Sequence, residues 1–436
     1  MPRSALPCAS RHVHGELSTT GTLWVTTDKR IAPLTGCRRV ARVSNTAPKL
    51  ACMSDAFDPA DLLPDELVER IRARADDVDR ANALPEQDID DLARAGYLTS
   101  LVPRELGGAA LTLERALETQ QRLAGAAPAT ALGVNMHLVW TAVARVLQNR
   151  GDDALAFVLE GAAHGELYAF GISEAGNELV LFDSTTRAKE TANGGYAFTG
   201  TKIFTSLAPA WTSLGVHGRD DSDPGAPRLV FAFLERDSRV TTLDDWDVTG
   251  MRGTQSRTTV LDGAVAPPER IVRVIDPEQG PDLVQFGIFA AFELLISSVY
   301  VGIAGRAIEL AASAARSRTS ARTGDARSED PVVRDRVGAM AIAYDGVRLE
   351  LRALARDVDE LVDHGRAWFP LLSGMKTRAV DTAQRIVDEA VALTGGAAFR
   401  NGNELSRLAR DVRAGAFHPS SESSARQSAA AGWLDA

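Results

Sequence analysis

The spacing of apolar residues changes twice along this chain of 436 residues, and these changes constrain what it can fold into. From Asp58 to about Leu147, and again from Asp282 onward, apolar residues recur with the spacing of amphipathic helices. Between roughly Gly165 and Val274, short runs rich in β-branched and aromatic residues are separated by Gly, Asp, Asn and Pro. The sequence therefore predicts a β-domain between two helical segments.

The expected fold class is α+β, with one domain in each of the three patterned segments. We expect an N-terminal helical domain over residues 53–164, an antiparallel β-domain over residues 165–275 and a C-terminal four-helix bundle over residues 276–436. Long helical patterns with short connections favour an up-and-down bundle in the last segment. Its expected helices are Leu283–Arg318, Pro331–His364, Trp368–Leu393 and Leu405–Ala414.

The first 52 residues differ in composition from the rest of the chain. They contain eight Lys and Arg against Glu16 and Asp28, and they hold all three cysteines, Cys8, Cys37 and Cys52. We interpret residues 1–52 as a disordered extension or as sequence upstream of a misassigned start, with a targeting peptide as the alternative. Because the remainder contains no thiol, we expect a cytoplasmic enzyme that needs neither disulfides nor zinc.

The charge balance and the apolar pattern argue against several classes of protein. The net charge of -10 disfavours nucleic acid as a partner, because phosphate binding needs a positive surface. No uninterrupted apolar run is long enough for a membrane span. The seven histidines lack metal-ligand spacing, and the sequence has neither a Rossmann fingerprint nor a P-loop, so no metal site is predicted.

Five sequence blocks occur in an order that is typical of one enzyme family. They read YLTSLVPRELGG from Tyr97, FGISEAG from Phe170, KIFTSL from Lys202, GMRGTQS from Gly250 and LARDVRAGAFHPS from Leu408. From about Leu62 to its end, the chain thereby resembles the acyl-CoA dehydrogenase family. The resemblance implies an FAD-dependent oxidoreductase and homotetramer. Such an enzyme acts on an acyl-CoA or a related small molecule and needs an electron-transfer partner.

The resemblance also implies which residues hold the flavin ring. Ile172 and Ser173 match positions whose main-chain amides and hydroxyl meet the pyrimidine edge, where reduced flavin gains negative charge. Phe204 matches an aromatic wall against the isoalloxazine, and Ser206 matches a hydroxyl that bonds flavin N5 or O4. Leu179 stands where the family has a serine on the pyrophosphate, so that contact differs here.

Three further residues imply a cofactor shared between subunits. Arg318 matches a family arginine that reaches the FAD pyrophosphate of a neighbouring subunit, since a planar guanidinium suits phosphate. Gly395 and Gly396 match a turn that the adenine side of FAD approaches from the partner. The family glutamine before that turn is Ala392 in this chain. The resemblance therefore implies an obligate homo-oligomer.

The catalytic base of most family members is missing from its usual place. That base is a glutamate nine residues after the arginine of an Arg-Asp pair, and nine residues after Arg410 stands Pro419. Removing the α-proton of a thioester requires a desolvated and aligned base. Three candidates remain: Glu293 in an apolar helical run, His418 eight residues after Arg410, and Glu422.

The choice of base separates two activities. With Glu293, we expect the family's default reaction, α,β-dehydrogenation of an acyl thioester with hydride transfer to flavin N5. With His418, the chain resembles flavin monooxygenases of the same fold, which take reduced flavin from a flavin reductase. A histidine base should titrate near about 6.5, and a desolvated carboxylate above about 4.3.

Two further interpretations are less consistent with the sequence. The third interpretation is a non-catalytic or DNA-associated flavoprotein of the same fold, and the acidic net charge argues against it. His137 lies in an apolar helical pattern, where a single histidine is more often a hydrogen-bonded core residue than an acid in a pocket.

Overall fold

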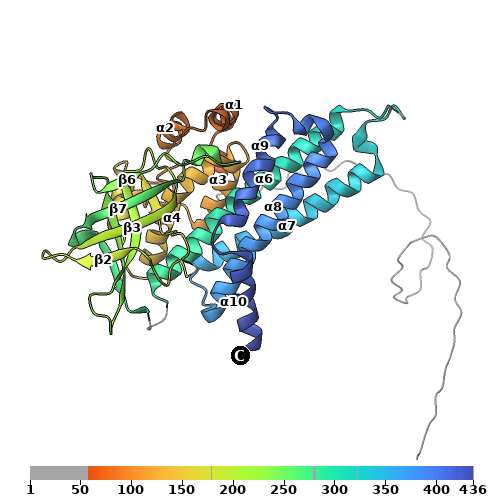
Figure 1. Cartoon of the computed structure of the whole chain (residues 1–436). Helices are drawn as coiled ribbons and strands as arrows, with labels where there is room; N and C mark the ends of the chain where they lie inside the picture. Colours follow the sequence, from red (N-terminus) through yellow and green to blue (C-terminus); the bar gives the residue numbers. More distant parts are fainter. Residues whose placement is uncertain (1–56, 178, 278–280, 322, 436) are drawn as a thin grey trace, which may run out of the picture. The chain divides into compact units, whose positions relative to one another are not determined.

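The predicted order of helices, strands and helices is confirmed (Figure 1). The computed structural model describes residues 57–177, 179–277, 281–321 and 323–435. All of them belong to one unit that spans residues 56–436. The predictions made for residues 1–52, including those for the three cysteines, lie outside the described residues.

Five helices precede the sheet. The first of them, α1, buries Leu67 and Ile71 on one face and ends at Asn82, whose left-handed φ of 49° stops the helix. Thr112 caps α3, because its side chain accepts a hydrogen bond from the amide of Arg115. The bounds are α1 Asp65–Ala81, α2 Glu86–Arg94, α3 Leu113–Ala124, α4 Pro128–Gln148 and α5 Ala156–Ala163.

The middle segment forms one 8-stranded sheet in the order β6-β7-β3-β2-β4-β5-β8, with β1 paired to β4. Most pairings are antiparallel, as predicted, but β1 and β2 both run parallel to β4. Parallel neighbours need a long crossover instead of a hairpin, which short-range turn signals do not reveal. The bounds are β1 Tyr168–Gly171, β2 Arg187–Glu190, β3 Tyr196–Thr205, β4 Ser213–Asp220, β5 Arg228–Glu235, β6 Val240–Thr242, β7 Arg257–Ala266 and β8 Ile271–Ile275.

The C-terminal segment contains the long helices of the predicted bundle. The bounds are α6 Leu283–Ser317, α7 Pro331–Asp359, α8 Trp368–Thr394, α9 Glu404–Asp411 and α10 Glu422–Leu434. Helix α9 is shorter than predicted because residues 412–417 continue as a 3₁₀ helix. Helix α10 was not predicted, although Ser421 caps it and an alanine-rich run follows.

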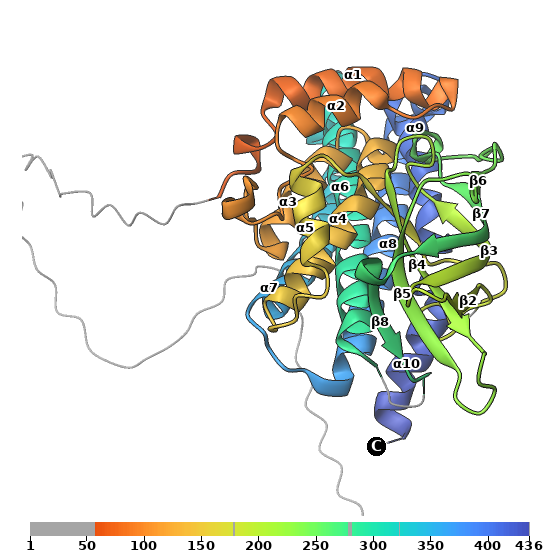
Figure 2. The same ribbon diagram turned by 90° about the vertical axis from the view of Figure 1, so that its left-hand side faces the viewer.

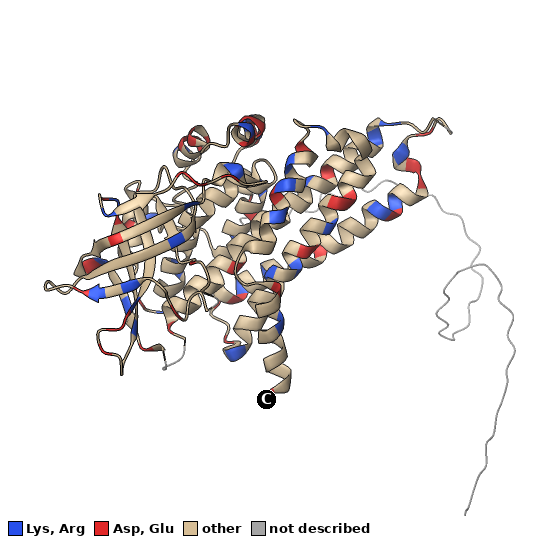
Figure 3. Cartoon of the chain, viewed as in Figure 1, with Lys and Arg blue, Asp and Glu red and all other residues tan. Residues whose placement is uncertain are grey.

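Charged residues join neighbouring helices of this bundle. Acidic and basic residues are interspersed along α7 and across the sheet in the view of Figure 3. Arg336 of α7 pairs with Glu389 of α8, and Arg378 of α8 pairs with Glu350 of α7. In one ion pair α7 supplies the arginine, and in the other α8 supplies it. The two pairs together fix the alignment of these antiparallel helices.

Two apolar helices, α4 and α6, pack at the centre between the sheet and the rest of the bundle (Figure 2). Both are long and apolar enough to cross a membrane, but 94% and 83% of their apolar windows are buried within the fold. That burial is typical of core helices. The indole of Trp140 on α4 donates to the carbonyl of Ala169 on β1 over 2.9 Å, which ties helix and sheet together.

Candidate active site

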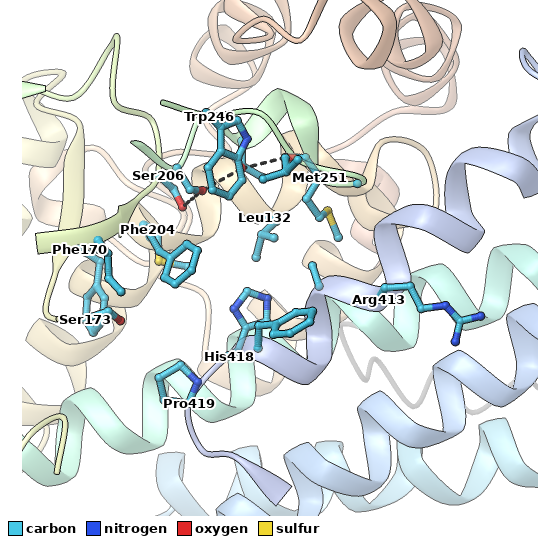
Figure 4. Close-up of a pocket in the computed structure, with 18 of the residues that line it drawn as sticks. Leu132, Phe170, Ser173, Phe204, Ser206, Trp246, Met251, Arg413, His418 and Pro419 are labelled. Carbon is cyan, nitrogen blue, oxygen red and sulfur yellow. Dashed lines mark hydrogen bonds between the residues drawn. The ribbon is translucent and has the colours of Figure 1, made fainter. Parts of the chain in front are cut away.

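A cavity of about 520 Å³ lies where α4, the sheet, α6 and the C-terminal segment meet. A volume of this size is typical of small-molecule and cofactor sites. Most of its wall is apolar, and the side chains that contribute to this wall include Leu132, Met136, Phe170, Phe204, Met251 and Phe292. Among the predicted site residues, Ser173, Phe204, Ser206 and His418 all line this cavity (Figure 4).

A bulge in the sheet directs Phe204 into the cavity. The pairing of β3 with β7 shifts register between Lys202 and Thr205, and Phe204 between them has a φ of 57°. A non-glycine residue in this region is strained, and such strain is maintained only where the surrounding structure enforces it. The side chain of Phe204 is 52% exposed and meets the ring of Trp246 edge-on at 6.2 Å. An aromatic face is therefore presented to the cavity.

Three hydroxyls form a directed chain behind Phe204. Thr254 donates to the carbonyl of Met251, so its oxygen accepts from Ser256, and the Ser256 oxygen in turn accepts from Ser206. The two hydroxyl–hydroxyl distances are both 2.7 Å. Because the Ser206 proton is used within this chain, the oxygen of Ser206 offers lone pairs to the cavity. The hydroxyl that the family resemblance assigns to flavin N5 or O4 is therefore an acceptor toward the cavity.

A buried ion pair supports the strand end that carries Ser173. Lys202 bridges to Glu174 over 2.7 Å and to the His217 carbonyl over 2.7 Å, with all three residues buried. Burial raises the pKa of Glu174, but the charge of Lys202 and the hydrogen bonds to Thr186 and its neighbours outweigh it, so the net pKa is lowered. Sequence analysis missed Glu174, although it directly follows Ser173.

His418 lies across the cavity from Ser206 and Trp246 (Figure 4). Its Nε2 is 2.7 Å from the hydroxyl of Tyr300, which belongs to α6. Burial and the charge of Asp411 raise the pKa of Tyr300 well above its usual value, so Tyr300 keeps its proton. Because its hydroxyl has no other hydrogen-bond partner among the described residues, that hydroxyl donates a hydrogen bond to Nε2. The neutral imidazole then carries its own proton on Nδ1.

The protonation expected for His418 differs from what burial imposes. Burial, assisted by the charge of Lys376, lowers the pKa of His418 to about 3 instead of leaving it near 6.5. The imidazole is therefore neutral at physiological pH. It acts as a hydrogen-bond donor and a weak base. The pH profile of activity should therefore show no titration of His418 near pH 6.5.

Glu293 and Lys376 hold the loop that carries His418. The Lys376 ammonium on α8 donates to the carbonyls of Gly415, His418 and Ser420 at 3.2, 2.8 and 2.9 Å. Oε1 of Glu293 accepts from the amide and the hydroxyl of Ser420 at 2.9 and 2.7 Å. Burial raises the pKa of Glu293, as predicted. Glu293 lines a second cavity, which also reaches His418.

The Arg-Asp pair of the C-terminal block fastens the loop over the first cavity. Arg410 makes two hydrogen bonds to the carboxylate of Asp79 on α1 and one to the carbonyl of Thr249. Oδ1 of Asp411 accepts from the amide of Met251 at 2.6 Å. The Arg-Asp pair thus positions residues 249–251 at the wall of the cavity.

The residues predicted for the adenine side of the cofactor form a separate cluster. Arg318 donates to the carbonyl of Thr394, next to Gly395 and Gly396, and so stabilises the C-terminal end of α8. Gly395 has a φ of 71°, which favours glycine. Arg318, which directly follows the last residue of α6, lies 25 positions after Glu293, roughly 37 Å along the helix. One flavin bound in the cavity cannot reach both clusters within one chain.

The remaining predicted residues have defined places. Ile172 is fully buried and lines the second cavity. His137 is a hydrogen-bonded core histidine, as expected: Nε2 bonds the Leu98 carbonyl at 2.7 Å, and Nδ1 accepts from the amide of Tyr168 at 3.3 Å. Glu422 pairs with Arg426 in the first turn of α10. Within the described ranges, no group of three or more His, Cys, Asp or Glu is arranged to hold a metal ion.

The residues that sequence analysis missed share one signal. Tyr300, Lys376 and Glu174 are polar groups within apolar or buried stretches. Tyr300 and Lys376 contact the predicted residue His418, and Glu174 contacts Lys202, which belongs to one of the five sequence blocks. Lys376 is one of only five lysines in the chain and falls on the buried stripe of its helix. A buried lysine without a sequence-local partner indicates a tertiary one.

Comparison with known proteins identifies relatives for most of the chain. Residues 62–166 match the family model described as acyl-CoA dehydrogenase, N-terminal domain, and residues 294–422 match the acyl-CoA dehydrogenase C-terminal domain. The chain is 29% identical over 376 residues to the L-evernosamine nitrososynthase of Micromonospora sp., which covers 80% of this chain and 84% of the relative. It is 27% identical over 374 residues to the dibenzothiophene monooxygenase of Rhodococcus erythropolis, with 81% and 88% covered.

A solved structure shows the same fold with a ligand. KijD3 in complex with FMN and dTDP-3-amino-2,3,6-trideoxy-4-keto-3-methyl-D-glucose is 26% identical to this chain, with a TM-score of 0.74. The similarity covers 87% of this chain and 95% of KijD3. The similar proteins thus include a nitrososynthase, a monooxygenase and an FMN complex.

Proposed function

We propose a function for this chain on the premise that it belongs to the acyl-CoA dehydrogenase family, whose N-terminal and C-terminal domain models it matches. The proposed enzyme is a monooxygenase that uses reduced flavin from a separate flavin reductase and oxidises a small molecule. Two relatives, the nitrososynthase and the dibenzothiophene monooxygenase, support this choice over dehydrogenation.

The observation that carries the proposal is the environment of His418. The imidazole lines the cavity that Ser173, Phe204 and Ser206 also line, and Tyr300 orients it through Nε2. Pro419, at the position of the family glutamate, has no group that takes up a proton. The other titratable residues that line this cavity in the described part of the chain are Glu174, Asp247, Arg410 and Arg413, and His418 stands directly before that position. Its Nδ1–H is suited to donating a hydrogen bond to the oxygen atom that is transferred there.

The directed hydroxyl chain supports a reduced flavin. Reduced flavin carries a hydrogen on N5, whereas oxidised flavin does not. Ser206, whose own proton is given to Ser256, offers an oxygen that accepts a hydrogen bond from such a group. Phe204 provides a flat apolar face beside it, and Ser173 provides a hydroxyl for the pyrimidine edge. These residues therefore fit a reduced isoalloxazine.

A bound reduced flavin would supply the electrons that activate molecular oxygen. The residues of the chain orient the reactants and exclude water. Phe292 and Met251 close the cavity with apolar side chains, which strengthens hydrogen bonds within it. His418 holds a proton at Nδ1 next to the site where an oxygen atom is transferred.

The proposed flavin is FMN, because the FMN complex of KijD3 has the same fold. The serine hydroxyls at the start of α10, which line the second cavity, suit its phosphate. The FAD prediction requires Arg318 of a neighbouring subunit, since that residue is too far away within one chain. A homo-oligomer and a cytoplasmic location complete the proposal as expectations from the sequence.

Dehydrogenation of an acyl thioester is the second candidate. One observation favours it, namely that Glu293 is a buried carboxyl group with a raised pKa on α6. Anaerobic titration with a panel of acyl-CoA thioesters tests this candidate. Bleaching of bound oxidised flavin by any of them would favour dehydrogenation and contradict the monooxygenase.

The decisive test of the monooxygenase compares two histidine variants. We expect His418→Ala to lower product formation by roughly 10²–10³-fold, the usual effect of removing one hydrogen-bond donor from the reaction site, while oxygen consumption with reduced FMN continues. Product and oxygen are measured in the same reaction. His164→Ala, which changes an exposed histidine bonded to the Glu160 carbonyl, serves as the matched control. Full coupling in His418→Ala would refute the assignment.

A further inference from the structure

Residues 249–251, which form part of the wall of the first cavity, have a strained and crowded conformation. Met251 has a φ of 54° and a ψ of 32°, the left-handed region that residues with a side chain rarely adopt. Gly250 lies so close to α9 that a Cβ at this position would be 2.4 Å from the backbone of Arg410. Such a conformation is maintained only where contacts from another part of the chain enforce it.

Asp411 supplies the contact that enforces this conformation. Its Oδ1 accepts a hydrogen bond from the amide of Met251 at 2.6 Å, and both residues are 1% exposed. A hydrogen bond to a carboxylate is shorter and stronger than one to a neutral acceptor. Loss of this bond would leave the amide of Met251 buried without its acceptor, which is unfavourable. Asp411 therefore stabilises the left-handed conformation of Met251.

The carbonyl of Met251 sets the direction of the hydroxyl chain. It accepts from the amide of Thr254 at 3.1 Å and from the hydroxyl of Thr254 at 2.9 Å. Because a carbonyl cannot donate, the Thr254 proton points to Met251, and the protons of Ser256 and Ser206 follow in the same direction. The dashed lines in Figure 4 run along this chain from Ser206 to Met251. The lone pairs of Ser206 therefore face the cavity as long as the Met251 carbonyl keeps its position.

A different conformation of Met251 would allow the chain to reverse. A change of φ and ψ turns the carbonyl of a residue relative to its amide, so Thr254 would lose the acceptor of its proton. Its hydroxyl would then donate to Ser256, Ser256 would donate to Ser206, and the Ser206 proton would face the cavity. A donating hydroxyl suits oxidised flavin, whose N5 carries no hydrogen, whereas an accepting hydroxyl suits reduced flavin.

We propose that Asp411 is a positioning residue that makes the first cavity prefer reduced over oxidised flavin. Asp411 is not among the described residues that line this cavity, and it acts on Ser206 through four successive hydrogen bonds. The inference rests on the proposed function, for which it names the residue that keeps the site in the state suited to the reduced cofactor.

The experiment measures the affinity of the full chain for reduced FMN and for oxidised FMN by anaerobic equilibrium dialysis. We expect the wild type to bind reduced FMN more tightly. Asp411→Leu and Ser206→Ala should each lower the ratio of the two affinities by roughly 2- to 12-fold, the value of one hydrogen bond. The double variant should lower the ratio no further than Ser206→Ala alone, because Asp411 acts through Ser206.

Three further variants separate positioning from a general loss of structure. Asp411→Asn keeps an oxygen that accepts from the Met251 amide, so it should retain most of the wild-type ratio. Gly250→Ala pushes residues 249–251 away from α9 without removing the carboxylate, and it should lower the ratio as Asp411→Leu does. Asp90→Leu, which changes an exposed aspartate of α2, is the matched control and should leave the ratio unchanged.

Three outcomes would overturn the inference: a wild type that does not prefer reduced FMN, an Asp411→Leu variant with the wild-type ratio, or a double variant in which the two single losses add. These outcomes are independent of the test of His418. If the ratio depends on Asp411 while His418→Ala stays fully coupled, the proposed function fails and the positioning role stands. If His418→Ala uncouples oxygen consumption while Asp411→Leu keeps the ratio, the positioning role fails and the proposed function stands.

Discussion

Two buried Lys–Glu pairs, one in the sheet and one in the helical bundle, are built differently. In the sheet, Lys202 contacts Glu174 directly, and both oxygens of Glu174 have hydrogen-bond partners. In the bundle, Lys376 and Glu293 each bind the loop of residues 415–420, and one oxygen of Glu293 has no partner. We call the Lys202–Glu174 pair closed, because both carboxylate oxygens have partners, and the Lys376–Glu293 pair open, because one oxygen of Glu293 has none in the described part of the chain.

The difference separates a structural role from a functional one. A closed pair satisfies the charges that burial would otherwise penalise, so it can fix the strand end next to Ser173. In the open pair, Glu293 uses one oxygen to hold the loop, and its other oxygen has no partner in the described part of the chain. The open pair also makes the position of His418 depend on two side chains from different helices. Residues of the same types therefore fix a strand end in one region and hold the His418 loop in the other.

The largest expected effect comes from breaking the closed pair. Lys202→Met should lower the free energy of unfolding by about 3–5 kcal/mol, because it leaves the carboxylate of Glu174 buried without its cation. Urea denaturation of the variant and the wild type measures the difference. Lys189→Met, which removes an exposed lysine of β2, is the control. A loss below about 1 kcal/mol for Lys202→Met would show that Lys202 does not compensate the buried charge of Glu174.

Breaking the open pair should have a smaller effect on stability and a distinct effect on titration. Lys376→Met removes three hydrogen bonds to loop carbonyls, which we expect to cost roughly 2–4 kcal/mol. It also removes a positive charge that lowers the pKa of His418, so this pKa should rise from about 3 toward its unperturbed value. Nuclear magnetic resonance of the imidazole follows the change directly.

The sign of the pH dependence follows from that shift. The folded-state pKa of His418 lies below the unfolded value of about 6.5, so the unfolded chain binds more protons in between. This residue therefore removes stability as pH falls from about 6.5 toward about 3. In Lys376→Met, the pH range over which His418 lowers the free energy of unfolding should become narrower, because its folded-state pKa lies closer to the unfolded value. An unchanged titration of His418 would contradict the role assigned to Lys376.

The smallest expected effect concerns Arg318, a cation that lies outside both pairs. Its guanidinium already has a partner in the Thr394 carbonyl, so Arg318→Ala should leave the affinity for FMN unchanged. If a neighbouring subunit contributes this arginine to FAD, the variant should retain FAD less well and assemble less completely. Equilibrium dialysis with each flavin and light scattering measure these properties. Unaltered FAD retention with an intact oligomer would remove Arg318 from the cofactor site.

Much of the fold and part of the site could be predicted from local patterns. The long helices were predicted closely because their apolar spacing lies within each segment: α6 and α8 end within one residue of the expected positions. Ser173, Phe204, Ser206 and His418 were selected from sequence blocks, and the fold brings them to one cavity. The parallel pairing of β1 and β2 with β4 was missed, since it depends on residues that are distant in sequence.

The sequence by itself determined the order of helices and strands, the absence of a glutamate at the usual position and the presence of His418 one residue before it. Only the tertiary structure decided what Glu293 does. Its partner Ser420 is 127 residues away in the chain, and Lys376 comes from a third element. Local periodicity fixes which face of a helix is buried, but the hydrogen-bond partner of a buried carboxylate depends on which distant segments pack against that face.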